Sequence, residues 1–187
     1  MDNSDFMNKM AELQNDYYAT NGKNTFFKKS QKVECANAVA NAIDIQQLLR
    51  YTMFIVPNTN KVFFDYTVFK MYGNESNYKM VIDYVIALFC ECTTTYGTYE
   101  AHVNLNTFTV SGCERHKNVI KLLMEECLRN ETTFASVLTN FYIYYPPSAL
   151  DTIHRITAPF IDPLVKSKIV VIPKGESEDR LKQLLSP

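Results

Sequence analysis

Cys113 and His116 are the two residues of this sequence whose types and spacing best fit covalent catalysis. They lie three residues apart in the first turn of a predicted helix, and a helix N-terminus lowers the pKa of a thiol. A thiolate beside an imidazole is the arrangement that cysteine-dependent enzymes use. No cysteine-hydrolase signature surrounds the pair, and such clusters are common as helix caps and surface ion pairs. We therefore predict that the chain is not an enzyme and keep cysteine chemistry as the weakest of three hypotheses.

Other candidate groups are weaker still. Cys90 and Cys92 lie two apart on a predicted helix and so point to different faces, and no second Cys/His pair follows at zinc-ligand spacing. Asp151 and His154 are three apart on a helix, which favours a solvent-side pair. The chain has only five glycines and contains neither G-x-G-x-x-G nor a Walker A loop. We predict no metal and no cofactor.

Composition narrows the class of protein further. The net charge of −1 provides no overall field for nucleic acid, so no nucleic-acid partner is expected. The longest apolar run, near residues 84–90, is far shorter than the roughly 20 residues of a membrane span. Five cysteines, an odd number without small-scaffold spacing, favour free thiols and a cytoplasmic location, with peripheral membrane attachment possible.

The first 50 residues predict a helical segment. Phe6, Met10, Leu13 and Tyr17 recur at helical spacing in a helix over residues 1–22. A second helix is expected over residues 31–50, capped by Ser30. Three lysines lie close together in this region: Lys28, Lys29 and Lys32. A solvated helix flank is favoured for them over a phosphate-binding patch.

From residue 51 on, strand and helix patterns alternate, which is typical of βαβ units and a mainly parallel sheet. The predicted strands cover residues 52–56, 62–69, 100–108, 141–145 and 168–172, and the first two form a tight antiparallel pair. Helices are predicted at about 77–94, 111–129 (capped by Ser111) and 176–185. The sequence thus predicts an α/β domain over residues 51–187 with a mostly parallel five-stranded sheet flanked by helices.

A helix between two prolines is the most distinctive feature of this domain. It is predicted over residues 147–161, directly after the strand at 141–145. One side of it is apolar, through Leu150, Ile153, Ile156 and Phe160. An ordinary core helix would show the same stripe. The prolines at both ends, however, separate the helix from its neighbours and permit a hinged element.

The same segment resembles the signature of the CRAL-TRIO lipid-binding family. The resemblance rests on YIYYP at 142–146, PFIDP at 159–163 and SKI at 167–169, which recur in the family's order and spacing. Weaker likeness extends over residues 60–69 and 99–110, so that the resemblance covers about residues 52–182.

The resemblance implies a sheet that forms the floor of an apolar pocket and a gate helix at 147–161 that admits a lipid. It implies lipid binding, lipid transfer or membrane docking without covalent chemistry. The residues expected to form the pocket and gate are Tyr142, Tyr144, Leu150, Ile153, Ile156, Phe160 and Lys168. In phosphoinositide-binding members a lysine at the position of Lys168 works with a glutamate before the strand, and this chain has Ser136 there.

An alternative stays open beside the lipid carrier. The aromatic residues at 141–145 could fill a pocket as easily as line it. The chain would then be a structural or protein-interaction module on the same fold, with protein partners, in a larger assembly or a virus particle.

Overall fold

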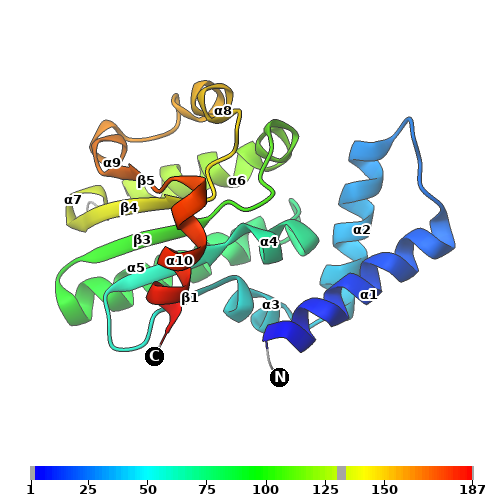
Figure 1. The fold of residues 1–187 in the computed structure, drawn as a ribbon, viewed down its shortest axis with the longest axis horizontal. Coiled ribbons are helices and arrows are strands. Elements are labelled where there is room, and N and C mark those ends of the chain that lie inside the picture. Colours follow the sequence, from blue (N-terminus) through cyan, green and yellow to red (C-terminus); the bar gives the residue numbers. More distant parts are fainter. Residues whose placement is uncertain (1–2, 130–133, 187) are drawn as a thin grey trace.

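The computed structural model describes residues 3–129 and 134–186. Its centre is a five-stranded sheet with the strand order β1-β2-β3-β4-β5 (Figure 1). The strands are β1 (Met53–Ile55), β2 (Lys61–Asp65), β3 (Tyr99–Asn104), β4 (Leu138–Tyr144) and β5 (Ile169–Val171). β1 and β2 are antiparallel, whereas β2, β3, β4 and β5 pair in parallel. The predicted α/β fold with a mostly parallel five-stranded sheet is confirmed.

Helices flank this sheet on both sides. They are α1 (Asn3–Asn21), α2 (Lys28–Ala42), α3 (Ile45–Thr52), α4 (Tyr66–Tyr72), α5 (Tyr78–Tyr96), α6 (Val110–Arg129), α7 (Phe134–Val137), α8 (Leu150–Thr157), α9 (Pro163–Ser167) and α10 (Lys174–Leu185). In Figure 1, α5 and α6 lie behind the sheet, α10 crosses in front of it, and α1 and α2 form a hairpin at one end. No helix in the described ranges is long and apolar enough to cross a membrane.

The main apolar core lies on the side of α5. Leu138, Tyr99 and Ala101 of the sheet pack there with Phe89 of α5 in one buried cluster. Phe6 and Met10 of α1 belong to the same cluster, and the Phe6 ring stacks on Tyr51 with centroids 3.9 Å apart. The N-terminal helices therefore share the core of the sheet. The predicted division into residues 1–50 and 51–187 stays a prediction.

Two predicted elements end earlier than expected because side chains cap the backbone. The strand predicted over 62–69 ends at Asp65, whose carboxylate accepts hydrogen bonds from the backbone N–H and hydroxyl of Thr67, both at 2.7 Å. This cap starts α4, and tertiary packing buries its residues as a helix. The strand predicted over 100–108 ends at Asn104, which accepts from the N–H of Asn106 at 3.0 Å.

The predicted helix over 31–50 is in fact two helices. The first helix, α2, ends at Ala42. Asp44 caps α3 by accepting a hydrogen bond from the N–H of Gln47 at 3.0 Å. Ser30 is not the cap, because α2 already begins at Lys28 and the Ser30 hydroxyl donates instead to Glu34. Ser111 is likewise inside α6, one residue after its start.

The helix expected over 147–161 is shorter, since α8 covers only Leu150–Thr157. Tyr145, just before the two prolines, has a left-handed backbone with φ of 49°. This conformation turns the chain sharply at the end of β4. Residues after Thr157 form turns up to Asp162, whose carboxylate caps α9.

Candidate functional site

Aromatic rings lie side by side across the sheet face that points towards α10. Phe54 pairs with Phe63, Phe63 with His102, and His102 with Tyr142, across four neighbouring strands. Paired residues in adjacent strands point to the same face, and so does the residue two positions on, Tyr144. We call Phe54, Phe63, His102, Tyr142 and Tyr144 the aromatic face.

A hydrogen-bonded network occupies the middle of the aromatic face. The Nδ1 atom of His102 lies 2.9 Å from the hydroxyl oxygen of Tyr144, and its Nε2 atom lies 3.2 Å from the Glu100 carboxylate. The Tyr142 ring stacks on the imidazole with centroids 4.7 Å apart. Burial lowers the pKa of His102, opposed by Glu100, and raises the pKa of Tyr144 to about 12. The neutral imidazole therefore donates to Glu100 and accepts from Tyr144.

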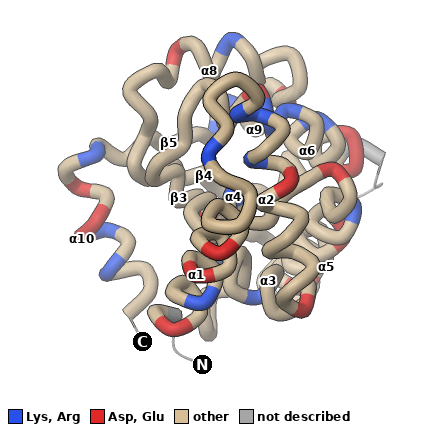
Figure 2. Tube along the Cα trace, turned by 90° about the vertical axis from the view of Figure 1, so that its right-hand side faces the viewer, with Lys and Arg blue, Asp and Glu red and all other residues tan. Residues whose placement is uncertain are grey.

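α10 covers the aromatic face with a narrow stripe of residues. Ser177 and Leu181 are buried and Leu184 is half-buried, at the spacing of successive turns on one side of the helix. Leu181 and Leu184 pack with Phe63 and Tyr144. The rest of α10 carries exposed charges of both signs (Figure 2).

The N-terminal end of α10 is tied to the end of β4. The backbone N–H of Tyr145 donates to the Ser177 hydroxyl at 2.8 Å, and that hydroxyl donates to the Pro173 carbonyl at 3.1 Å. The helix is thus fixed at its first turn and rests on the sheet through two leucines.

α8, the predicted gate helix, packs beside α6. Its Ile153 and Thr157 are buried and its Leu150 and Ile156 are half-buried, as is Phe160 in the turn that follows. The predicted site residues therefore fall into separate groups. Tyr142 and Tyr144 lie on the aromatic face under α10. The apolar residues of α8 lie in the connection between β4 and β5, where the helix packs beside α6.

Lys168 immediately precedes β5, and its backbone carbonyl accepts a hydrogen bond from the N–H of Phe141 in β4 at 2.9 Å. Its ammonium donates to the carbonyl oxygens of Ala135 at 2.7 Å and Ser136 at 3.2 Å, and to the carbonyl oxygen of Leu138. These contacts hold the end of α7 and the start of β4 against the start of β5.

The C-terminal part of the chain also matches a known family. Residues 103–187 match the family model of the CRAL/TRIO domain. The resemblance predicted from the sequence is thereby confirmed over this part of the chain. CRAL/TRIO domains generally bind apolar ligands and are not enzymes. No protein with curated annotation matches the chain in sequence.

The matched CRAL/TRIO part covers slightly less than half of the chain. It begins within β3 and includes β4, α8, β5 and α10. Tyr142 and Tyr144 of the aromatic face and its cover, α10, therefore lie within the matched residues. Phe54 and Phe63 come from the strands before it.

The His116 ring, one of the two groups with catalytic potential, contacts residues other than Cys113 through both of its nitrogens. Burial raises the pKa of the Cys113 thiol, the opposite of what a nucleophile needs. The His116 imidazole contacts the Tyr78 hydroxyl through Nδ1 at 2.9 Å and accepts from Arg115 Nε through Nε2 at 3.0 Å. Burial and Arg115 lower the pKa of His116 to about 3. Both ring nitrogens are thus committed to other partners.

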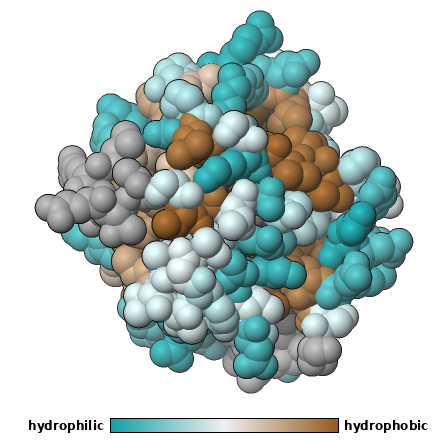
Figure 3. Space-filling model, turned by 90° about the vertical axis from the view of Figure 1, so that its left-hand side faces the viewer, coloured by the Kyte–Doolittle hydropathy of each residue, from teal (hydrophilic) through white to brown (hydrophobic). Residues whose placement is uncertain are grey.

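Two hollows in the surface lie away from the aromatic face. One, of about 580 Å³, lies between α1 and α2 and has a polar lining that includes Tyr17, Asn24 and Glu34. The other is lined by residues of α3 and Asp44. On the side that carries α7 and α9, apolar side chains form separate patches among hydrophilic ones (Figure 3), and Leu164 and Val171 are exposed.

Sequence reasoning missed the role of α10. It predicted the helix, but not that the helix would cover the face on which Tyr142 and Tyr144 lie. The signal available was the spacing of Ser177, Leu181 and Leu184 in an otherwise charged helix. Phe54 and Phe63 were predicted in strands, but their alignment with Tyr142 depends on register, which only the sheet shows.

Proposed function

We propose that this chain is a non-enzymatic lipid-binding or lipid-transfer domain that holds an apolar chain on the aromatic face, beneath α10. The observation that supports it best is the cover of this face: a helix anchored at its first turn, resting on the sheet through Leu181 and Leu184. The match of residues 103–187 to the CRAL/TRIO family model, whose members generally bind lipids, supports the same class of ligand. The odd number of cysteines favours action in the cytosol, at or near a membrane surface.

The free energies of lipid exchange are compatible with movement of α10 away from the sheet. Burying an acyl chain of about sixteen methylenes contributes on the order of 10 kcal/mol, and leaving a bilayer costs about the same, so the two nearly cancel. Exposing Leu181 and Leu184 would cost about 2–4 kcal/mol. Lifting α10 is therefore a modest cost that the incoming chain offsets by covering the same rings.

α8 and Lys168 have supporting roles in this proposal. The half-buried Leu150 and Ile156 of α8, with Phe160 in the turn after it, form an apolar side that could contact a bilayer during exchange. Lys168 keeps α7, β4 and β5 together through its three carbonyl contacts. Headgroup recognition by Lys168 would first require breaking those contacts.

Native mass spectrometry of the full chain purified from cells tests the proposal. A carrier should retain a lipid, seen as a mass above that of the chain. Phe54→Ser, on the aromatic face, should lower the occupied fraction several-fold, whereas Tyr96→Ser, at an exposed position on α5, should leave it unchanged. A bare chain mass and no uptake of added fluorescent fatty acid would reject the proposal.

A structural or protein-interaction module is the second candidate. The network of His102, Tyr142 and Tyr144 favours it, because the stacked rings already fill the space above the middle of the sheet. This candidate predicts a bare chain mass for the wild type. It also predicts that Tyr142→Ala, which removes a filling ring, does not create lipid uptake.

A further inference from the structure

Two aromatic side chains project from the connection between α1 and α2. Phe26 is 91% exposed and Phe27 is 70% exposed, well above the other exposed large apolar side chains described, which reach 47%. The connection lies at the end of the molecule far from α10 (Figure 1). Two adjacent exposed phenylalanines at a protruding tip are unfavourable in water, which calls for a partner.

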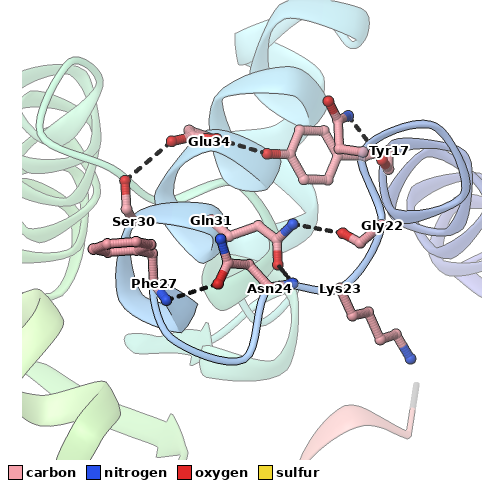
Figure 4. Close-up of a pocket in the computed structure, with 9 residues that line it drawn as sticks. Tyr17, Gly22, Lys23, Asn24, Phe27, Ser30, Gln31 and Glu34 are labelled. Atoms are coloured by element: carbon pink, nitrogen blue, oxygen red, sulfur yellow. Dashed lines mark hydrogen bonds between the residues drawn. The ribbon is translucent and has the colours of Figure 1, made fainter.

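The connection is held in place by hydrogen bonds. The Asn24 side-chain oxygen accepts from the backbone N–H groups of Phe26 and Phe27, both at 2.9 Å. The Gln31 side chain accepts from the Asn24 N–H at 2.8 Å and donates to the Gly22 carbonyl at 2.6 Å (Figure 4). The two rings are therefore presented outward by a fixed turn.

The chain segment that carries these rings has charge of one sign. Residues 22–33 contain Lys23, Lys28, Lys29 and Lys32 and no acidic residue, although the whole chain has a net charge of −1. The first acidic residue after them, Glu34, accepts hydrogen bonds from Tyr17 and Ser30. In Figure 4, Lys23 extends away from the other labelled side chains. The tip thus combines apolar rings with a local positive charge.

We propose that the connection between α1 and α2 docks on the surface of an anionic lipid bilayer. Phe26 and Phe27 enter the boundary between headgroups and acyl chains, and the four lysines contact lipid phosphates and carboxylates. A protruding tip with two rings suits a soft interface of this kind. A stable protein interface needs roughly 1,200 Å² or more of matched surface, which two exposed rings on one short connection do not offer.

This docking site goes beyond the proposed lipid pocket and is independent of it. The tip belongs to the N-terminal hairpin, outside residues 103–187 that match the CRAL/TRIO domain. It would hold the protein at a membrane whether or not the aromatic face carries a lipid.

Sedimentation of the full chain with vesicles tests the docking site. Vesicles of phosphatidylcholine alone are compared with vesicles of phosphatidylcholine mixed with phosphatidylserine, at low and high salt. The wild type should bind the anionic vesicles at least about tenfold more tightly, and salt should weaken that binding. The double variant Phe26→Ser/Phe27→Ser should lose about tenfold or more in affinity for anionic vesicles. Lys28→Gln/Lys29→Gln should lose about tenfold as well and depend less on salt.

Matched controls separate the tip from general effects. Tyr96→Ser removes an exposed aromatic ring from α5, and Lys79→Gln/Lys182→Gln removes two exposed charges elsewhere. Both should bind like the wild type. Circular dichroism should show unchanged folding for every variant, since all of these side chains are exposed.

Specific outcomes would overturn the proposal. Wild-type affinity in the phenylalanine variant, or equal binding of the wild type to both vesicle types, rejects an anionic membrane site. If the phenylalanine variant instead dissociates a dimer in analytical ultracentrifugation with vesicle binding intact, the tip is an interface between copies. Lipid occupancy by native mass spectrometry should be unchanged in the tip variants, so a failure here is distinct from a failure of the lipid pocket.

Discussion

The two faces of the sheet are covered in different ways. Behind the sheet, Phe89 of α5 stacks on Tyr99 of β3 with centroids 4.4 Å apart, inside a large cluster that extends to α1. In front, α10 contacts the aromatic face through two leucines, and a polar network lies beneath. The stabilisation from burial grows with the apolar surface area removed from water, so the rear face supplies most of the folding free energy. We therefore expect the front face to exchange its cover while the domain stays folded.

The two buried histidines show the same contrast. His116 lies behind the sheet with Tyr78, Phe69 and Arg115 around it, and its pKa falls to about 3. His102 lies in front, where the Glu100 carboxylate opposes the effect of burial on its pKa. The rear histidine is locked in its neutral form, whereas the front one has an anion ready to stabilise its charged form.

The largest expected difference in stability is between variants of the two faces. Phe89→Ala should lower the free energy of unfolding by about 3–5 kcal/mol, since the ring is buried between Tyr99 and Phe134. Phe54→Ala, at a half-buried position on the aromatic face, should lower the free energy of unfolding by about 1–2 kcal/mol. Urea unfolding measures both. Equal losses would remove the distinction between a packed face and a lightly covered one.

α8 offers a similar comparison on one helix. Ile153→Asp should cost about 3 kcal/mol or more, because it places a carboxylate at a buried position in the contact between α8 and α6. Leu150→Asp, at a half-buried position in the first turn of α8, should cost about 1 kcal/mol. Thermal unfolding followed by circular dichroism checks the pair. If Leu150→Asp unfolds the chain as well, both positions are core, and α8 has no free apolar side.

Acid should lower the stability of the folded chain through His116, the histidine behind the sheet. The folded-state pKa of His116 is about 3 and the ordinary value is 6.5, so between these values the unfolded chain binds the proton and the folded chain does not. Stability should therefore fall as the pH falls below 6.5, by about 1.4 kcal/mol per pH unit, or about 2 kcal/mol at pH 5.

Denaturant titrations of the wild type and two variants at pH 7 and pH 5 measure this loss. His116→Gln should remove most of it. His102→Gln should remove less, because Glu100 favours the charged form of that ring. A larger effect at His102 would reverse the contrast between the two faces.

The last comparison concerns α10, the helix that covers the aromatic face. Leu181→Ala should lower the global stability by only about 1–2 kcal/mol. Hydrogen exchange should accelerate in α10 while α5 stays protected, because α10 opens locally. Uniform acceleration across both helices would show that α10 is an integral part of the fold and not a separable cover.

Local sequence patterns predicted the elements well and their ends less well. The alternation of strands and helices, and the prolines around residues 146–163, gave the sheet and the family resemblance. The observed ends of elements differ from the predicted ones where a side chain accepts a hydrogen bond from the backbone, as with Asp65, Asp44 and Asn104. A cap competes with strand or helix propensity by a single hydrogen bond, which periodicity does not detect.

The predicted pocket and gate residues stay a prediction as a ligand site, and the structure places them in separate groups. Tyr142 and Tyr144 lie on the aromatic face, but Phe54 and Phe63 of the same face are about 80 to 90 residues earlier in the chain. The expected gate residues of α8 pack beside α6, and α10 lies over the rings instead. Lys168 was read as a ligand contact and is bonded to three carbonyl oxygens.

The sequence by itself determined the fold class, the parallel order of its βαβ units and the apolar character of its helices, since these depend on periodicity and composition along the chain. Only the tertiary structure decided which helix covers which face and which rings share a register. Those outcomes depend on contacts between residues far apart in sequence, and on side-chain hydrogen bonds that form only once the strands are side by side.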